Sequence, residues 1–312
     1  MRGESLQNRS TSRPRVSIGL PVYNGERYLH DTLQSLLAQT YRDFELIITD
    51  NASTDATPEI CGKFAERDSR VRYFRNRKNL GASANYNRAF GVSHGEYFKW
   101  AAHDDLCEPR YLETCVELLD QNPRAVVAHC KTGIIDEHGH QVREYDDFLD
   151  LRSPSPRERL RVYFWRPAAE WNAIFGLIRS DVLRGTPLIG KFIASDQVLL
   201  GELTMKGLVL QAPQHLFFRR DHSENSWRAH QTTDELHAWY DPTPRNGFRS
   251  PLVFRHFLEY RRAIGRSRLR LSERAWCHLY VHRWFAQQVV RKIRHKWQSR
   301  QRIADRSSAA ST

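Results

Sequence analysis

The chain has 312 residues, of which 40% are hydrophobic and 27% charged, and these values exclude a chain that is disordered throughout. The net charge of +12 lies entirely in residues 251–312, which carry 15 lysines and arginines against three acidic residues. Five cysteines without a Cys-x-x-Cys pair argue against a disulfide framework and a thiolate zinc site, and favour a reducing compartment. No apolar run approaches the roughly 18 residues of a membrane-spanning helix, and the first 15 residues lack the apolar centre of a signal peptide.

Residues 16–101 alternate between short apolar runs and helical patterns. Strands are expected at 16–20, 44–49, 71–74 and 97–101. The leucines of residues 29–37 recur at helical spacing, Thr57 with Pro58 is a typical helix start, and residues 82–92 form a third helical pattern. This order predicts an α/β fold with a Rossmann-like, mainly parallel sheet flanked by helices, which binds ligands beyond the carboxyl ends of its strands.

The remainder of the chain is less regular. Helices are expected at 111–119 and 197–205, and strands at 126–129, 173–178 and 208–210, with a polar stretch around Ser153–Pro156. From Arg255 onward the sequence is helical and basic with a broad apolar face, which suits either a solvated helix or one lying on an anionic membrane surface. We therefore divide the chain into a leader at 1–13, a main domain at 14–228 and a basic, mainly helical C-terminal extension at 229–312.

Acidic and polar side chains follow the predicted strands. Asp104 and Asp105 come directly after the fourth strand, where paired carboxylates and substrate phosphates can hold a divalent cation. A solvated acidic loop or a helix cap is the alternative for this pair. Asp50 and Asn51 end the second strand, where they can contact a base or ribose, or can serve only in turns and caps.

Two further segments face the same predicted edge. Pro21 and Tyr23 after the first strand offer an apolar wall, and Gly81 before the third helix would let backbone approach a phosphate or sugar, or would simply form a turn. The two commonest glycine-rich fingerprints for dinucleotides and triphosphates are absent from the sequence.

Four segments together resemble glycosyltransferase family 2, a group of inverting transferases with the GT-A fold, over about residues 15–226. They are VSIGLPVYNGERYL, FELIITDNASTDATPEI, NRKNLGASANYNRAF and EYFKWAAHDD. The resemblance implies a GT-A domain at 14–228 and a divalent metal, Mg or Mn. It places a nucleotide-sugar donor against Pro21, Tyr23, Asn24, Asp50, Asn51, Gly81, Asn87 and Asp104, and the metal on Asp105.

Two positions depart from the family pattern. Asn51 stands where the family usually has a second aspartate, and an amide can donate as well as accept hydrogen bonds. Tyr86 stands where an arginine is frequent, so any phosphate or sugar contact of that arginine is replaced or lost, whereas Asn87 matches.

The resemblance extends to two downstream segments. Asp196 aligns with the aspartate that removes the proton of the acceptor hydroxyl, although Ser195 or Asp196 would also serve as a helix cap. His222 aligns with a histidine that can reach the metal or the diphosphate, with Arg219 or Arg220 as an electrostatic aid, and a solvated loop histidine is the alternative.

We therefore expect an inverting, metal-dependent glycosyltransferase that moves a sugar from a nucleotide-sugar to a hydroxyl of a glycan or of a lipid-linked acceptor. The preferred donor is a UDP-sugar, and the expected setting is envelope or surface polysaccharide synthesis. The expected location is cytoplasmic, or peripheral on the inner face of the membrane through the basic helices, with no nucleic-acid partner. The alternatives are a catalytically inactive sugar-nucleotide binding protein, a nucleotidyltransferase, to which LPVYNGERYL is a poor match, and a nucleic-acid or membrane binder acting through the basic tail.

Overall fold

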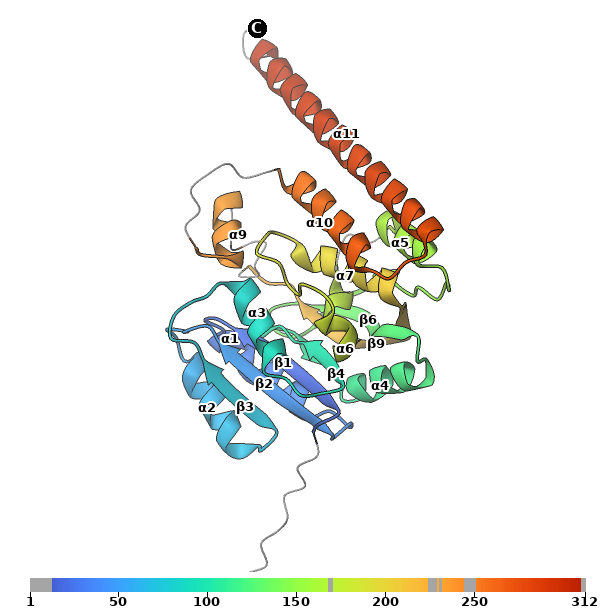
Figure 1. Ribbon diagram of the computed structural model, residues 1–312. Coiled ribbons are helices and arrows are strands. Elements are labelled where there is room, and N and C mark those ends of the chain that lie inside the picture. Colours follow the sequence, from blue (N-terminus) through green and yellow to red (C-terminus); the bar gives the residue numbers. More distant parts are fainter. Residues whose placement is uncertain (1–12, 168–170, 224–228, 230–231, 244–250, 310–312) are drawn as a thin grey trace, which may run out of the picture.

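The N-terminal half of the sheet consists of four parallel strands joined by helices (Figure 1). The computed structural model describes residues 13–167, 171–223, 229, 232–243 and 251–309, with side chains as far as residue 294. The strands are β1 (Val16–Val22), β2 (Phe44–Asp50), β3 (Val71–Arg75) and β4 (Tyr97–Trp100), and the helices are α1 (Glu26–Leu37), α2 (Thr57–Arg67) and α3 (Ala82–Gly91). These elements confirm the predicted β-α-β-α-β-α-β order.

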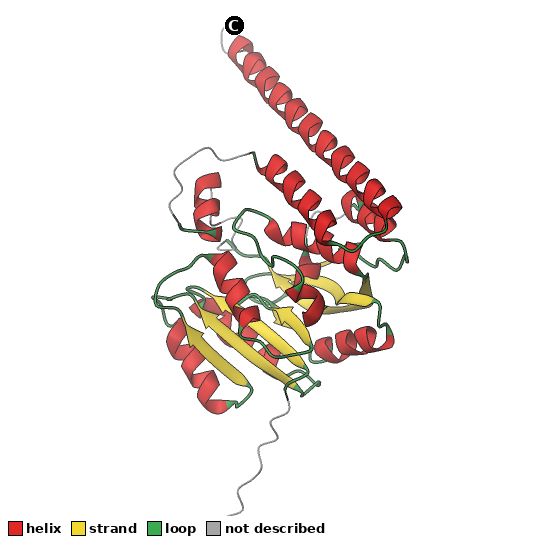
Figure 2. Ribbon diagram, in the orientation of Figure 1, coloured by secondary structure: helices red, strands yellow, loops and turns green. Residues whose placement is uncertain are grey.

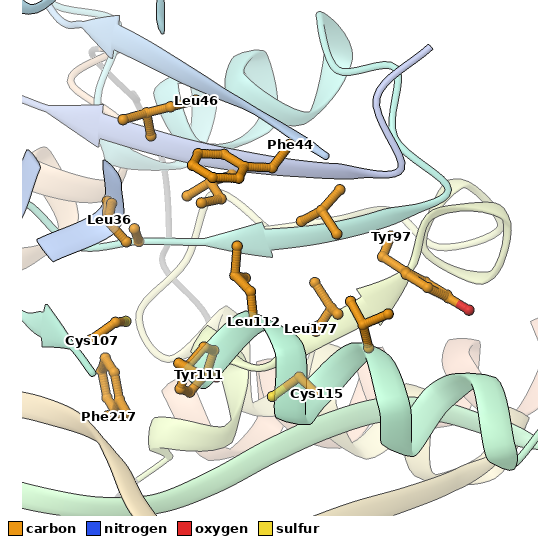
Figure 3. Close-up of a cluster of buried hydrophobic side chains, with 14 of the residues drawn as sticks. Leu36, Phe44, Leu46, Tyr97, Cys107, Tyr111, Leu112, Cys115, Leu177 and Phe217 are labelled. Atoms are coloured by element: carbon orange, nitrogen blue, oxygen red, sulfur yellow. The ribbon is translucent and has the colours of Figure 1, made fainter. Parts of the chain in front are cut away.

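Every residue of β1 and β2 is buried, as expected for central parallel strands covered on both faces. On one side α1, α2 and α4 (Tyr111–Gln121) enclose a first hydrophobic core, in which Leu36, Phe44, Leu112 and Phe217 lie together (Figure 3). On the other side α3 packs over the sheet, and its Phe90 joins a second core with Phe98 and Trp100. The predicted α/β architecture with helices on both faces is therefore confirmed (Figure 2).

The second half of the described chain extends this sheet with mixed strand directions. It adds β5 (Leu106–Cys107), β6 (Ala125–Ile135), β7 (Gln141–Tyr145), β8 (Leu177–Arg179) and β9 (Leu208–Arg220). Among the described residues the strand order is β3-β2-β1-β4-β8-β6-β9-β5, and β7 pairs with β6. β6 and β9 are parallel to each other, whereas β8 is antiparallel to both β4 and β6.

Several elements differ from the sequence-based expectation. The segment expected as a strand at 173–178 is a 3-10 helix at Asn172–Phe175, and β8 begins only at Leu177. Gly176 follows this turn in an extended conformation, and a Cβ there would lie 2.8 Å from the carbonyl oxygen of Ala128, so glycine is needed where the chain enters β8 beside β6. The polar stretch around Ser153–Pro156 leads into α5 (Pro156–Trp165), whose apolar face was not recognised.

The helices that complete the described chain are α6 (Ser180–Arg184), α7 (Ser195–Lys206), α9 (Thr233–Tyr240), α10 (Leu252–Arg266) and α11 (Leu271–Ala309). Tyr260 of α10 and Val281 of α11 are buried in the second core, and the Trp284 ring stacks on Phe164 of α5 at 5.5 Å. Arg266 forms an ion pair of 2.6 Å with Glu202, which is buried in α7. The first half of α11 is therefore part of the fold, whereas its second half extends away from it (Figure 1).

The expected leader at 1–13 lies outside the described residues except for Arg13. The end of the main domain near residue 228 also lies outside them. In the part of the chain that the structure describes, no helix combines the length and the apolar character needed to cross a membrane.

Val281 and Val290 give a matched test of where α11 joins the core. Val281 is 1% exposed and Val290 is 47% exposed. Val281→Ala removes two buried methyl groups and is expected to lower the free energy of unfolding by about 2 kcal/mol, whereas Val290→Ala is expected to leave it within about 0.5 kcal/mol. Urea denaturation of both variants checks this, and equal losses would contradict the packing described here.

Candidate active site

The first two strand ends form a rim made largely of turn hydrogen bonds. The backbone N–H of Asn24, which has φ of 50°, donates to Ser53 Oγ, and Asn24 Oδ1 accepts from Thr54 N–H at 2.9 Å. Asp50 is fully buried and accepts from Ser53 N–H at 2.8 Å and from the Tyr73 hydroxyl at 2.9 Å. These contacts hold together the turns that follow β1 and β2.

The wall expected beside this rim is only partly exposed. Pro21 is buried inside β1, where it pairs with Thr49. Tyr23, one residue beyond the strand, is 43% exposed. Of these two, only Tyr23 presents its side chain to a ligand at the strand ends.

Asn51 holds the loop that precedes α3. Its Oδ1 accepts from the Leu80 backbone N–H at 2.9 Å, and this backbone donor fixes which end of the amide is oxygen. Its Nδ2 donates to Asn79 Oδ1 at 2.8 Å, and that oxygen also accepts from Gly81 N–H. Asn76 Nδ2 completes the set at 2.8 Å from Asn51 Oδ1.

This network explains the departure from the family's second aspartate. A carboxylate at position 51 could still accept from Leu80, but it could not donate to Asn79 Oδ1, and Asn79 cannot rotate its amide without losing Gly81 N–H. The amide of Asn51 is therefore committed to the loop, and the donor capacity that distinguishes it from aspartate is used inside the protein.

A two-residue strand brings the acidic pair to the end of β9. Leu106 and Cys107 of β5 pair with Phe218 and Phe217, which places the residues just before β5 beside those that end β9. Asp105 Oδ1 accepts from Arg220 N–H at 3.0 Å. His222, 5% exposed, lies with its Nε2 at 2.9 Å from Asp104 Oδ2. The predicted pair and the predicted histidine therefore meet, although they are more than 100 residues apart in the sequence.

The two neighbouring carboxyls have opposite pKa shifts. Burial raises the pKa of Asp105, and the charge of Asp104 raises it further, to about 8, against the opposing effects of Arg220 N–H, Arg219 and Lys99. Burial also disfavours the charged form of Asp104, but His103 and the hydrogen bond from His222 outweigh it, so the pKa of Asp104 is lowered. The pair thus carries negative charge that the protein compensates incompletely.

These residues fit a divalent cation. Asp104 is the acid with the lowered pKa, and an ionised carboxylate only accepts, so His222 Nε2 is the donor in their contact. His222 Nδ1 is buried and has no hydrogen-bond partner among the described residues. A histidine that donates one nitrogen to a carboxylate and offers the other is the usual arrangement of a metal-binding histidine.

The protein does not supply a complete coordination sphere. Among the described residues, no cluster of three or more His, Cys, Asp or Glu side chains is arranged to hold a metal ion. Hard divalent cations commonly take one or two carboxylates and complete their coordination with substrate phosphates and water. The site therefore fits a cation that binds together with a diphosphate.

The expected catalytic base lies at the start of α7. Asp196 is in the first turn of that helix and is partly exposed, and the cap position itself is occupied by Ala194. Burial raises the pKa of Asp196 to about 6, and hydrogen bonds from its own N–H and that of Gln197 oppose the shift. The carboxyl therefore contacts first-turn N–H groups, in line with the capping role considered from the sequence, and is also partly open to solvent.

α3 holds the loop that leads to Asp196. Asn87 forms a reciprocal pair with Ile189, donating to its carbonyl oxygen at 2.9 Å and accepting from its N–H at 3.0 Å. Ser83 Oγ donates to the carbonyl of Gly190 at 2.7 Å. Asn87, predicted to bind the donor, uses its amide to position this loop.

α9 contributes two contacts that the sequence did not predict. The Tyr240 hydroxyl accepts from the N–H of Ala194, a residue with φ of 57°, at 3.1 Å. Gly81, with φ of 82°, lies directly under this segment, since a Cβ there would be 2.7 Å from the carbonyl oxygen of Tyr240. Gly81 is therefore needed for backbone approach, but the neighbour is protein backbone and not a phosphate.

Tyr86 lies between the two groups of carboxylates. Burial raises its pKa, and the charges of Asp104, Asp105 and Asp196 raise it further, so all three lie within electrostatic range of one phenol. Its carbonyl oxygen accepts from Trp100 Nε1 at 3.0 Å, which fixes α3 against the end of β4. The acidic pair and the expected base therefore share one site, with Tyr86 in the place of the family's arginine.

The structure shows roles for two residues near this site that the sequence did not predict. Lys99 was not singled out, and Arg220 was given a different role. Lys99 is fully buried, donates to the carbonyl of Phe175 at 2.5 Å and lies 4.6 Å from the centre of the Tyr111 ring. The one sequence feature that could have indicated a buried lysine is its position inside the apolar run EYFKWAA. The guanidinium of Arg220, expected to aid the departing nucleotide, instead donates to the backbone carbonyls of Asp104, Asp136 and Glu137.

The family model for glycosyl transferase family 2 matches residues 17–182. The chain belongs to this family. An uncharacterised glycosyltransferase of Rickettsia typhi is 34% identical to this family 2 chain over 134 residues, and glycosyltransferase GlyA of Streptococcus pneumoniae is 38% identical over 100 residues. These matches cover 43% and 32% of the chain, but only 41% and 14% of the two relatives. The chain thus spans less than half the length of these relatives.

Solved structures of related fold support the GT-A assignment of this family 2 member. S. aureus TarS in complex with UDP has a TM-score of 0.63 at 16% identity, covering 87% of this chain and 72% of that chain. The mannosyltransferase PcManGT from Pyrobaculum calidifontis, in complex with GDP-Man and Mn²⁺, has a TM-score of 0.53 at 18% identity, covering 90% and 76%. The predicted mainly parallel GT-A type sheet is thus confirmed.

The Asn51 network gives a prediction that runs against the family pattern. Asn51→Asp is expected to lower the free energy of unfolding by about 1–3 kcal/mol, because the donor to Asn79 is lost and two acceptor oxygens then face each other. Asn24→Asp is the matched control, since Asn24 uses only its Oδ1 as acceptor for Thr54 N–H and aspartate tolerates positive φ. Urea denaturation distinguishes them, and an Asn51→Asp variant as stable as the control would refute the network's role.

Proposed function

We propose that this family 2 chain is an inverting, metal-dependent glycosyltransferase that moves a sugar from a UDP-sugar to a hydroxyl of a glycan or lipid-linked acceptor. The observation that carries the proposal is that α3 joins the end of β4, next to Asp104 and Asp105, to the loop that leads to Asp196. Trp100 Nε1 donates to the Tyr86 carbonyl, and Asn87 pairs with the backbone of Ile189. This arrangement offers a candidate cation-binding pair and a separate, partly exposed carboxyl held by one helix. The complexes of related folds with UDP and with GDP-Man and Mn²⁺ support a nucleotide-sugar donor and a divalent metal.

Asp105 and His222 would hold the cation, Mg²⁺ or Mn²⁺, with Asp104 fixing the histidine ring. A bound divalent cation neutralises charge that develops on the departing nucleoside diphosphate. The rim at the ends of β1 and β2 would receive the nucleotide, with Tyr23 as its exposed aromatic face and the loop ordered by Asn51 beside it. Gly81, Asn87 and Asn24 support the shape of this site through the contacts described above.

Asp196 is proposed to act as the general base. It takes the proton from the acceptor hydroxyl as that oxygen attacks the anomeric carbon, and the bond from that carbon to the diphosphate oxygen breaks on the opposite face, which inverts the configuration. A pKa of about 6 leaves Asp196 ionised at neutral pH yet more basic than an exposed aspartate. The proposed setting, envelope or surface polysaccharide synthesis on the cytoplasmic side, follows from the resemblance of the family motifs alone.

Nucleotide binding tests the cation site. Binding of UDP, GDP, dTDP and CDP to the purified chain is measured by calorimetry with and without Mn²⁺. One nucleotide is expected to bind with a metal-dependent affinity that Asp105→Asn lowers at least tenfold, because the buried carboxylate that faces the cation is lost. Asp31→Asn, on the exposed side of α1, is the control and is expected to bind like the unaltered chain. Binding of none of the four nucleotides would overturn the proposed function.

Donor hydrolysis tests the base without knowledge of the acceptor. Release of nucleoside diphosphate from the matching nucleotide-sugar to water is expected to fall about 10²- to 10⁴-fold in Asp196→Asn, while nucleotide affinity stays unchanged. Asp181→Asn, an exposed first-turn aspartate of α6, is the control. Because the base must be ionised, kcat/KM is expected to decline tenfold per pH unit below about 6 and to level off above it. If Asp196→Asn keeps full activity, Asp196 is not the base. If the unaltered chain does not turn over any nucleotide-sugar, the protein is better described as an inactive sugar-nucleotide binder.

A further inference from the structure

The outward side of α11 carries a row of exposed apolar side chains. Trp276, Leu279, Val290 and Ile293 are 43%, 53%, 47% and 62% exposed. At about 100° per residue, the last three fall within roughly 60° of one another around the helix. The buried Cys277 and Val281 lie on the opposite side, in the second core. The helix thus has two apolar faces, of which only one is covered by the protein.

Basic residues surround this half of α11, and Arg294 lies beside the uncovered row, about 40° from Val290 around the helix. Residues 274–304 contain eight lysines and arginines and no aspartate or glutamate. Arg291, Lys292 and Arg294 are all exposed. No ion pair joins these three side chains to a carboxylate within the described residues. The two acidic residues that precede this segment are used elsewhere, since Glu259 pairs with Arg262 and Glu273 accepts from Ser155 Oγ.

We propose that the outward face of α11, defined by Leu279, Val290, Ile293 and Arg294, docks on an anionic membrane surface. A bilayer interface offers acyl chains to the apolar row and negative head groups to the cation, so both parts of the face are satisfied by one partner. The other cations of this helix half add to the attraction of the surface at longer range. This inference goes beyond the proposed transfer reaction and does not depend on it.

Charge disfavours the other occupants of this face. A second copy of α11 would bring the same cations together with no acidic residue on residues 274–304 of either copy to neutralise them. A nucleic acid would satisfy the cations but would leave Val290 and Ile293 in water. The helix extends about 58 Å from Leu271 to Ala309 at the usual rise per residue, and its second half stands clear of the body (Figure 1). The face is therefore free to meet an extended flat surface.

Vesicle co-sedimentation of the full chain tests the proposal. The probes are vesicles of phosphatidylcholine alone and vesicles in which one third of the lipid is phosphatidylglycerol. Binding is expected to be at least tenfold tighter to the anionic vesicles and to weaken as salt is raised. The double variant Val290→Ser, Ile293→Ser is expected to lose at least tenfold in affinity, because the inserted apolar groups are gone. Arg294→Gln is expected to weaken the preference for anionic lipid, whereas Lys292→Gln, on the opposite side of the helix, is expected to weaken it less.

Val142→Ser is the matched control, because Val142 is 59% exposed on β7, far from α11 in the sequence, and its change is expected to leave binding unaltered. Urea denaturation of each variant checks that the fold is intact, as the exposure of these residues predicts. Equal binding to both vesicle types, no binding to either, or an equal loss in the control would overturn the proposal. So would a concentration-dependent dimer that the double variant abolishes, or salt-sensitive binding of single-stranded DNA stronger than that of vesicles. The nucleotide-binding experiment is read separately, so failure here leaves the transferase assignment standing.

Discussion

Burial of carboxylates at one sheet edge is the constraint on which the site depends. Asp104 and Asp105 are adjacent and enclosed, and Asp196 acts on the same phenol, Tyr86. The protein compensates part of the charge with His222, which bonds to Asp104, and with the charges of Arg219 and Lys99, which favour ionised Asp105. Burial, with the charge of Asp104, nevertheless raises the pKa of Asp105 to about 8, and a divalent cation is the partner whose charge would favour the ionised form. A site that costs stability in its empty form is well suited to a ligand that brings both metal and diphosphate.

The same edge is held together by α3, which connects the nucleotide side to the base side. Trp100 Nε1 bonds to the backbone of Tyr86 in the middle of the helix, Ser83 and Asn87 bond to the loop before α7, and Asn51 fixes the loop that begins the helix. Because these contacts run from β4 to Asp196, a shift of α3 would move the proposed cation site and the proposed base together. α9 closes the arrangement by placing Tyr240 against Ala194 and over Gly81.

Sequence patterns were most informative where contacts are local. The apolar period of Leu29, Leu33 and Leu36, and the Thr57-Pro58 helix start, gave correct elements because helix formation depends on neighbours three and four residues apart. The strand expected at 173–178 forms only from Leu177, because residues 172–175 are a 3-10 helix, and nothing local indicates that Gly176 lies against Ala128 of the distant strand β6. Similarly, β5 has only two residues, and nothing in so short a segment indicates that it pairs with β9.

The sequence by itself determined the α/β order, the family, and the residue types available at each strand end. Those features follow from periodicity and from motifs that are contiguous along the chain. Tertiary structure alone decided which of these residues are available for chemistry. It committed Asn51, Asn87 and Gly81 to internal contacts, joined His222 to Asp104, and left Asp196 partly exposed in the first turn of α7. The physical reason is that hydrogen-bond partners and burial, which set the pKa of a group and its freedom to bind, come from segments far apart in the chain.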